Sequence, residues 1–258
     1  MKGIVLAGGL GTRLFPLTKI TNKHLMPIYN RPMIHYPIQT LADGGIDEIL
    51  IVTGGKNAGG FLELLGNGQD FELRHLHYTY QEGEGGIAAA LSLARDFAES
   101  DPVCVILGDN IYEKSVRESV DAFRGNPVGA RIHLKQVQNP QRFGVPVIDG
   151  DRIVRIEEKP ARPKSDYAVT GLYMYDNSVF DVIRTLKPSR RGELEISDVN
   201  NAYIDRGEMT YALVDGWWSD AGTFESLLRA NILMASRFNG NAEEISQEVV
   251  QAAARELK

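Results

Sequence analysis

Residues 3–18 read GIVLAGGLGTRLFPLT, an apolar run that enters a turn in which three glycines stand beside a threonine and an arginine. Glycine has no Cβ and tolerates positive φ, so backbone N–H groups in such a turn can approach an anion closely. The dinucleotide fingerprint needs a third glycine where this chain has Leu14, and the P-loop needs a Gly-Lys-Ser/Thr sequence that this turn lacks. The turn therefore predicts a phosphate site of another kind, with a variant dinucleotide site as the alternative.

The opening run is one of four that are continuous rather than alternating, which is typical of strands covered on both faces. They occupy residues 3–8, 48–54, 103–109 and 130–137. Helical patterns lie between them, the clearest at 33–45 and 87–100. This alternation predicts an α/β fold with a doubly wound, mostly parallel, Rossmann-like sheet over residues 1–140.

After Pro140 the strand patterns become closely spaced. Residues 145–149, 152–158 and 167–176 are typical of strands, and Asp149-Gly150-Asp151 is typical of a hairpin turn. We expect an antiparallel insertion at the edge of the main sheet or above it. Helices are predicted at 177–188, 193–207 and 224–238, a strand at 209–216, a turn at 217–223, and a closing helix or tail at 241–258.

The composition narrows the class of protein. Of 258 residues, 43% are hydrophobic and 24% charged, and no apolar run reaches the length of a membrane span. The N-terminus MKGIVLAGG lacks the features of a signal peptide, and the single Cys104 fits a reducing compartment, so we expect a cytoplasmic protein. A formal net charge of −6 argues against a nucleic-acid partner but permits an anionic small molecule held by a few Arg and Lys side chains.

Two cations follow the glycine turn. Because Pro16 and Pro27 limit helix formation, we expect a long extended loop that brings Arg13 and Lys23 near one site. Two cations beside a glycine turn favour a triphosphate ligand. Solvated loop charges are the alternative.

Further short motifs follow the opening stretch. NKHLMP, LGDNIY, RFGV, EEKP, YAVTGLYMYD, GELEISDVN and WSDAGT occur in this order. With GGLGTRLFPLT they resemble the sugar-1-phosphate nucleotidylyltransferases, and among these the short-form glucose-1-phosphate thymidylyltransferases, from residue 1 to about residue 235. The resemblance implies that glucose 1-phosphate attacks the α-phosphorus of dTTP in line, giving dTDP-glucose and pyrophosphate. Alternatives are UTP or another hexose 1-phosphate, a non-catalytic sugar-nucleotide sensor, and a dinucleotide-dependent oxidoreductase.

Asp109 ends the predicted strand 103–109, at the edge where an open α/β sheet binds its ligand. Mg²⁺ binds through one or two carboxylates together with phosphate oxygens and water, so a second carboxylate is expected. The resemblance implies that Asp220 in WSDAGT is this second metal ligand. For Asp109 the alternative is a helix-capping role.

The resemblance also implies which side chains act on the phosphates. Arg13 holds the β- and γ-phosphates, Lys23 lies on the triphosphate side, and Lys159 contacts the sugar phosphate; with Asp109 they are the expected catalytic residues. Gln81 reads the pyrimidine edge, because an amide offers a donor and an acceptor. The expected nucleotide-binding residues are Leu6, Gly8, Gly9, Gly11, Thr12, Arg13, Lys23, Gln81, Gly86 and Asp109.

For the sugar phosphate, the resemblance implies contacts from Asn110, Gly144, Glu158, Lys159 and Val169. Glu158 can accept two hydroxyl hydrogen bonds, unless EEKP is only a solvated strand end. Trp217 and Trp218 are expected to wall this pocket, with one of them in the core. His24 stands where longer relatives have glutamine, near the expected nucleotide sugar, and Phe143 replaces a tyrosine. The choice between dTTP and UTP therefore stays open.

We expect a single nucleotidyltransferase domain over residues 1–258. Residues 1–140 are expected mainly to bind the nucleotide, residues 141–240 mainly to bind the sugar and supply the second metal ligand, and residues 241–258 to form a C-terminal helix or tail. Mg²⁺ is the expected cofactor. A homo-oligomer is the expected assembly, with no nucleic acid or membrane as partner.

Overall fold

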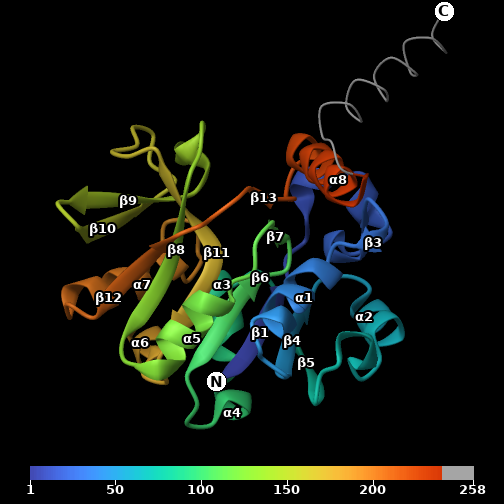
Figure 1. Cartoon of the computed structure of the whole chain (residues 1–258), viewed down its shortest axis with the longest axis horizontal. Coiled ribbons are helices and arrows are strands. Elements are labelled where there is room, and N and C mark those ends of the chain that lie inside the picture. The colour runs from blue at the N-terminus through green and yellow to red at the C-terminus, as the bar shows by residue number, and fades with distance from the viewer. Residues whose placement is uncertain (240–258) are drawn as a thin grey trace, which may run out of the picture.

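The computed structural model describes residues 1–239, which fold around a seven-stranded sheet of order β12-β8-β11-β6-β1-β4-β5 (Figure 1). Its strands are β1 (Lys2–Ala7), β4 (Glu48–Gly54), β5 (His75–Gln81), β6 (Val103–Leu107), β8 (Ala130–Gln136), β11 (Tyr167–Tyr175) and β12 (Met209–Leu213). β1 pairs in parallel with β4 and β6, and β4 with β5. The predicted mostly parallel sheet is therefore confirmed, while the predicted element at 241–258 lies outside the described residues.

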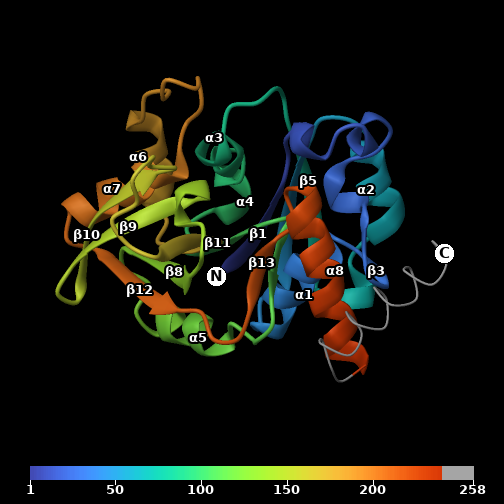
Figure 2. The same cartoon turned by 90° about the horizontal axis from the view of Figure 1, so that it is seen from above.

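Helices cover both faces of the sheet. Successive residues of each strand point to opposite faces, so they belong to two separate buried cores. In β1, Ile4 and Leu6 belong to one buried cluster, and Val5 and Ala7 to the other. The first core lies under α3 (Ile87–Ser92), α4 (Arg95–Ala98), α6 (Val179–Thr185) and α7 (Ile196–Asp205), and the second under α1 (His35–Asp43), α2 (Ala58–Leu65) and α5 (Arg117–Gly125). Figure 2 shows α1 and α5 across the sheet from α3 and α6. In the described part of the chain, no helix is long and apolar enough to cross a bilayer.

β11 lies elsewhere than predicted. It is inside the main sheet, antiparallel to β6 on one side and to β8 on the other, whereas we expected all antiparallel strands at the edge or above. Every residue of β11 after the first is buried, so both of its faces need cover that an edge does not supply. β9 (Gly144–Asp149) and β10 (Arg152–Glu158) do form the predicted hairpin, as a separate two-stranded sheet that turns at Gly150 with φ +61°.

The predicted turn at 217–223 contains a strand. β13 (Trp218–Asp220) pairs antiparallel with β7 (Asn110–Tyr112), which follows β6 after only two residues. Behind this pair, α8 (Phe224–Asn239) packs on a third buried cluster that includes Ile111, Ala221 and Ala230. The prediction of a turn was wrong here because the strand is only three residues long and its partner lies far away in the sequence. This pairing carries residues 218–220 to the carboxyl edge of the main sheet.

Two further predictions need correction in detail. The predicted helix at 87–100 is divided into α3 and α4, because Leu93 and Ala94 donate to carbonyls three residues back and tighten the end of α3. The segment after the glycine turn is not extended. It forms the 3₁₀ turns Thr12–Leu14, Leu17–Lys19 and Lys23–Leu25 and the short pair β2 (Pro27–Ile28) and β3 (Arg31–Pro32), since a turn of three residues fits between prolines that exclude a longer helix.

Candidate active site

A cleft of about 720 Å³ opens at the carboxyl edge of the sheet, where the parallel strands β1, β5 and β6 end. The glycine turn after β1 forms one wall, and the start of α3 forms another. Nine of the ten residues predicted to bind nucleotide line this cleft: Leu6, Gly8, Gly9, Thr12, Arg13, Lys23, Gln81, Gly86 and Asp109. The fold therefore brings together side chains that the sequence places more than a hundred positions apart.

Gly11, the tenth residue, shapes the turn and is not among the lining residues. It has φ +61°, and a Cβ built on it would lie 2.9 Å from Cγ2 of Thr18. The Thr18 hydroxyl donates to the Gly11 carbonyl at 3.0 Å, which closes the turn. A Cβ built on Gly8 would lie 2.8 Å from Oε1 of Gln81, so a larger residue here would displace the Gln81 amide.

The pairing of β7 with β13 brings Asp109 and Asp220 together. The N–H of Ala221 donates to the Asp109 carbonyl at 2.9 Å, and Asp220 stands opposite Asn110 in the strand register. A Cβ built on Gly222 would lie 3.4 Å from Oδ2 of Asp109 and 3.5 Å from Oδ2 of Asp220. The Oδ2 atoms of both carboxylates therefore lie near one point beside Gly222, with Nη2 of Arg13 3.1 Å from the same point.

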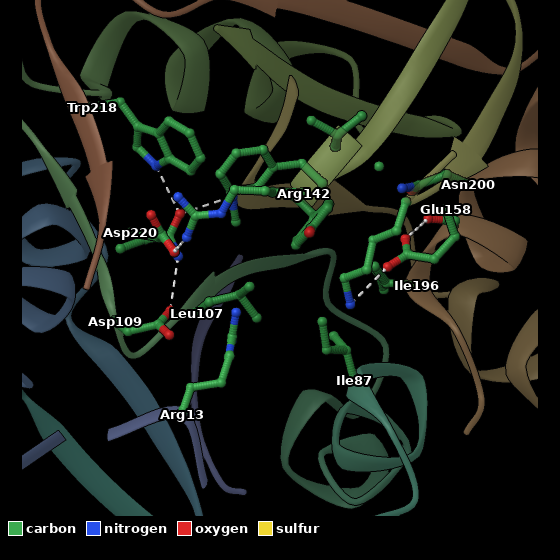
Figure 3. A pocket seen from close by; sticks show the side chains of 18 residues that line it. Arg13, Ile87, Leu107, Asp109, Arg142, Glu158, Ile196, Asn200, Trp218 and Asp220 are labelled. Atoms are coloured by element: carbon green, nitrogen blue, oxygen red, sulfur yellow. Dashed lines mark hydrogen bonds and ion pairs between the residues drawn. The ribbon is translucent and has the colours of Figure 1, made fainter. Parts of the chain in front are cut away.

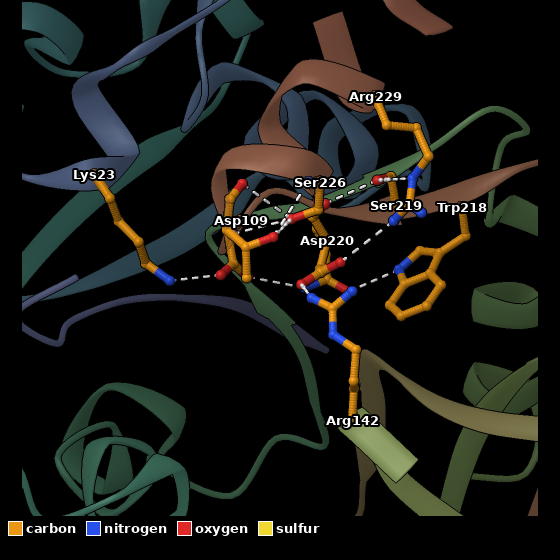
Figure 4. Close-up of polar contacts among 10 residues, drawn as sticks. Lys23, Asp109, Arg142, Trp218, Ser219, Asp220, Ser226 and Arg229 are labelled. Atoms are coloured by element: carbon orange, nitrogen blue, oxygen red, sulfur yellow. Dashed lines mark hydrogen bonds and ion pairs between the residues drawn. The ribbon is translucent and has the colours of Figure 1, made fainter. Parts of the chain in front are cut away.

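Asp109 has close polar partners (Figure 4). Lys23 donates from Nζ to Oδ2 at 2.5 Å, and Asn110 donates from Nδ2 to Oδ1 at 2.9 Å. Burial alone would raise the pKa of Asp109, but the adjacent Lys23 ammonium holds that pKa well below its usual value. Asp109 is therefore a carboxylate at neutral pH.

Asp220 is held more loosely, between two arginines. Its Oδ2 lies 3.5 Å from Nη2 of Arg142, and its Oδ1 lies 3.7 Å from Nη2 of Arg229. Oδ1 is buried and has no hydrogen-bond partner among the described residues. Burial, followed by repulsion from the Asp109 carboxylate, raises the pKa of Asp220 above its usual value.

The donor set suits a hard divalent cation. The Oδ2 atoms of the two carboxylates lie near one point, and the other Asp220 oxygen, Oδ1, is buried without a hydrogen-bond partner among the described residues. Residues 1–239 contain no group of three or more His, Cys, Asp or Glu side chains arranged for a metal, as a closed zinc site would need. Mg²⁺, which takes one or two carboxylates and completes its shell with phosphate oxygens and water, fits these residues.

A second cavity, of about 150 Å³, adjoins the cleft under the β9–β10 hairpin and α7 (Figure 3). All five residues predicted to contact the sugar phosphate line it: Asn110, Gly144, Glu158, Lys159 and Val169. Six residues line both cavities: Arg13, Ile87, Leu107, Asp109, Arg142 and Lys159. The junction of the two cavities is therefore framed by three cations and one carboxylate.

Glu158 and Lys159 turn into this junction at the end of β10. Lys159 has φ +43°, a conformation that only surrounding structure can hold, and its N–H donates to the Phe143 carbonyl at 3.0 Å. Glu158 accepts from Ser197 Oγ at 2.6 Å on Oε2, and its Oε1 lies 3.3 Å from Lys159 Nζ. The structure thus places EEKP in a cavity wall and not at a solvated strand end.

Asn110 and Trp218 form the opposite wall of the second cavity. Oδ1 of Asn110 accepts from the Gly171 N–H at 2.9 Å and from Nε1 of Trp218 at 2.7 Å. The Trp218 ring lies edge-on to Phe143, with centroids 5.3 Å apart. Trp217 packs against the third buried cluster and Trp218 against the second, but both are only half-buried, so only the cavity-lining role of Trp218 agrees with the prediction.

Gln81 and His24 lie deep in the larger cleft. Nε2 of Gln81 donates to the Gly86 carbonyl at 3.2 Å, so the two predicted base contacts touch each other. Nδ1 of His24 contacts Oδ1 of Asn22 at 2.8 Å. Burial, with a smaller contribution from the Lys23 ammonium, lowers the pKa of His24 to about 3, so its ring is neutral at pH 7.

Sequence reasoning missed several polar residues that line the two cavities, among them three that contact predicted site residues. Arg142 lines both cavities, Arg191 lines the larger cleft with Nη2 3.8 Å from Oε1 of Glu158, and Ser197 holds the Glu158 carboxylate. Arg142 belongs to the quoted motif RFGV, and Ser197 to GELEISDVN. Arg142 and Ser197 could have been found because they lie inside motifs that the family resemblance had already picked out. Arg191 lies just before the motif GELEISDVN and so was harder to find.

Comparison with known proteins identifies relatives of this chain. A family model described as nucleotidyl transferase matches residues 2–237. A glucose-1-phosphate thymidylyltransferase of Neisseria meningitidis is 46% identical over 234 residues, which cover 89% of this chain and 81% of the relative. One from Mycolicibacterium smegmatis is 45% identical over 235 residues, covering 90% and 81%.

Two solved structures are similar to this chain. A Bacillus anthracis protein described as a glucose-1-phosphate thymidylyltransferase, crystallised in complex with sucrose, is 51% identical with a TM-score of 0.86, over 90% of this chain and 94% of that chain. A UDP-glucose pyrophosphorylase complexed with UDP-glucose has a TM-score of 0.79 over 92% of this chain and 98% of that chain. At 21% identity, the second likeness shows the shared fold alone.

Proposed function

Because the chain belongs to the nucleotidyl transferase family, we propose that it acts as a glucose-1-phosphate thymidylyltransferase, as its relatives are named. Such an enzyme joins dTTP and glucose 1-phosphate to give dTDP-glucose and pyrophosphate. The observation that carries the proposal is the junction of two cavities, framed by Arg13, Arg142, Lys159 and Asp109. Two anionic substrates need to meet where fixed positive charge offsets their repulsion.

The nucleotide occupies the larger cleft with its triphosphate against the glycine turn, and glucose 1-phosphate occupies the smaller cavity. An oxygen of the sugar phosphate attacks the α-phosphorus in line. The new P–O bond forms as the bond to the leaving pyrophosphate breaks. No covalent enzyme intermediate is required, so this chain acts mainly by positioning the reactants and by stabilising charge.

The cations divide this work according to where they lie. Arg13, at the turn, holds the β- and γ-phosphates together with the turn amides. Lys159, at the junction, offsets the repulsion between the sugar phosphate and the α-phosphate. Lys23 keeps Asp109 ionised through their ion pair and supports the triphosphate side.

Mg²⁺ is assigned to Asp109 and Asp220, whose oxygens face one point. When bound, the ion neutralises negative charge on the phosphate oxygens during transfer. Asp109 is ready for this role because its pKa is lowered and it carries its charge at neutral pH.

Recognition of the sugar and the base falls to neutral and acidic groups. Asn110 and Glu158 offer side-chain partners for sugar hydroxyls, and Gly144 and Val169 offer backbone groups. In the larger cleft, Gln81 and the Gly86 backbone adjoin one another and can contact the edge of one pyrimidine. His24 lies in the same cleft as a neutral ring.

The proposal is tested by following pyrophosphate release with glucose 1-phosphate and Mg²⁺, with dTTP, UTP, ATP, CTP and GTP compared at equal concentration. We expect a strong preference for dTTP. Comparable turnover with UTP would contradict the assigned nucleotide and make His24 and Gln81 the residues to exchange next. No turnover with any nucleotide would overturn the proposed reaction and favour a sugar-nucleotide sensor on the same fold.

A cytoplasmic location and a homo-oligomeric assembly are also proposed. The first is supported by the single buried Cys104, which has no cysteine partner anywhere in the chain. Size-exclusion chromatography with light scattering tests the second. A mass equal to one chain would contradict it.

A further inference from the structure

Arg142 has no role in the scheme above beyond framing the junction. It ends the 3₁₀ turn Pro140–Arg142 that leads into β9, and its side chain is 34% exposed. Its Nη2 lies 3.5 Å from Oδ2 of Asp220, and its Cζ lies 5.5 Å from the centroid of the Phe143 ring. Figure 3 shows the guanidinium between Asp220 and the smaller cavity.

The contact of Arg142 with Asp220 is a loose charge pair. At 3.5 Å it is at the long limit for a hydrogen bond, whereas the Lys23–Asp109 pair measures 2.5 Å. The other Asp220 oxygen has no hydrogen-bond partner among residues 1–239. Asp220 is therefore neutralised in part, and the guanidinium keeps N–H groups that can bind another anion.

We propose that Arg142 is a catalytic residue with two successive partners. In the free enzyme it is the counter-ion of Asp220. Asp220 would hold a divalent cation in place of this pair, and the Arg142 guanidinium would then donate N–H bonds to oxygens of the transferred phosphoryl group. Only the second partner, the phosphoryl group, depends on the proposed function.

Three features of the site support an exchange of partners. A cation at Asp220 repels a guanidinium that shares the same carboxylate oxygen. The Phe143 ring gives the guanidinium a second attraction that does not depend on Asp220, so it stays near the junction. The planar guanidinium offers paired donors that match the oxygens of a phosphate.

The other cations near Asp220 are less suited to this exchange. Lys23 is bound to Asp109 at 2.5 Å. Arg13 also acts on Asp220 and lines both cavities, but it is already assigned to the β- and γ-phosphates. Arg229 lines neither cavity and donates from Nε to Ser219 Oγ at 3.4 Å, so it supports Asp220 from α8 without facing the junction. Arg142 and Arg229 therefore form a matched pair, since both neutralise Asp220 but only Arg142 can reach the substrates.

The first arm of the test measures Mn²⁺ binding to the substrate-free full chain by electron paramagnetic resonance. Arg142→Gln is expected to bind Mn²⁺ about tenfold more tightly, because a competing charge next to Asp220 is removed. Arg142→Lys keeps the charge and should stay near wild type. Arg184→Gln removes an exposed arginine that pairs with Asp181 and serves as the remote control. Unchanged Mn²⁺ affinity in Arg142→Gln would overturn the counter-ion role.

The second arm measures pyrophosphate release from dTTP and glucose 1-phosphate. Arg142→Gln should lower kcat by about 10²-fold with little change in the KM for dTTP, because the lost contact is with the reacting phosphoryl group. Arg229→Gln should also tighten Mn²⁺ binding but lower kcat by less than about tenfold. Arg142→Lys should recover only part of the rate, since an ammonium lacks the paired donors.

The outcomes separate the two levels of the proposal. A kcat for Arg142→Gln within threefold of wild type would overturn its catalytic role. A wild-type chain that turns over none of the substrates would instead contradict the proposed function, while the Mn²⁺ arm, which needs no substrate, would still decide the counter-ion role. Thermal unfolding of each variant is compared with that of Arg184→Gln, and Arg142→Lys keeps the test decisive if Arg142→Gln does not fold.

Discussion

The two sides of the junction hold their charges differently. On the nucleotide side, Lys23 and Asp109 form an ion pair of 2.5 Å between side chains that are only 13% and 12% exposed. On the sugar side, Lys159 lies 3.3 Å from Glu158 with exposures of 46% and 27%, and Arg191 lies 3.8 Å from the same carboxylate. Solvent screens the second set of pairs far more than the first.

This difference indicates which charges are free to change partners. A short, buried pair such as Lys23–Asp109 is costly to break, because each separated charge would lack compensation. Long and partly exposed pairs contribute little to stability and can be replaced by a phosphate at small cost. We infer that the nucleotide side is preformed and that the sugar side rearranges when its ligand arrives.

The largest effect is expected from Asp109→Asn compared with Asp220→Asn. Asp109→Asn should lower kcat/KM by on the order of 10⁴-fold, because it removes a charged metal ligand and leaves Lys23 without its counter-ion. Asp220→Asn should cost about 10²-fold, because burial and then repulsion from the Asp109 carboxylate raise the pKa of Asp220, so the site already disfavours its charge. Pyrophosphate release over a range of Mg²⁺ concentrations measures both losses, and equal losses would remove the distinction between the two carboxylates.

Lysine substitutions on the two sides sharpen the comparison. Lys159→Met should lower kcat by about 10³-fold while the melting temperature barely moves, since its exposed ion pair stabilises the fold by less than about 1 kcal/mol. Lys23→Met should cost about 10²-fold in rate and about 3 kcal/mol in the free energy of unfolding, because Asp109 is left buried and unpaired. Activity assays and urea unfolding on the same preparations separate the two effects. A loss of stability in Lys159→Met as large as in Lys23→Met would show that both sides are equally fixed.

The two sides also differ in how far sequence could predict them. On the nucleotide side, Gly8 follows directly on β1 and Asp109 is the second residue after β6, and carboxyl ends of parallel strands meet at one edge. Asp220 depends on the pairing of two three-residue strands, β7 and β13, that are more than a hundred residues apart. Hydrophobic periodicity carries no information about such a pairing, so only the family resemblance pointed to it.

The same limit explains the error at β11. Its antiparallel direction was predicted correctly, but its place in the sheet was not, because closely spaced strand patterns do not say which strands of the main sheet a strand joins. Arg142 was missed for a local reason, since an arginine before Gly144 in the sequence is indistinguishable from a surface charge. Its significance depends on Asp220, which the fold places beside it.

Acid sensitivity offers a third contrast, centred on the buried His24. Its pKa in the folded chain is about 3, below the usual 6.5, so between these pH values the unfolded chain binds a proton that the folded chain does not. The free energy of unfolding should therefore fall as pH drops through this range, by as much as about 1.4 kcal/mol per pH unit for this group. His133, whose pKa is lowered to about 4 chiefly by burial, should act in the same direction.

Urea unfolding of His24→Gln at pH 6 and at pH 5 measures this contribution. From pH 6 to pH 5, the unfolding free energy of wild type should fall by about 1 kcal/mol more than that of His24→Gln. His133→Gln is the matched variant, because it removes an equally buried histidine that lies outside both cavities. A pH dependence in His24→Gln identical to wild type would mean that the nucleotide side does not keep this histidine neutral.

The smallest effect is expected from Ser197→Ala on the sugar side. Ser197 donates to Glu158 at 2.6 Å and so fixes one carboxylate oxygen, while the other faces Lys159 and Arg191 over longer distances. Loss of this bond should raise the KM for glucose 1-phosphate about fivefold, equivalent to about 1 kcal/mol, with kcat within twofold of wild type. Ser92→Ala, which removes an exposed hydroxyl on α3, is the control. A fall in kcat at unchanged KM would mean that Ser197 positions the reacting groups themselves, so that the sugar side would be as preformed as the nucleotide side.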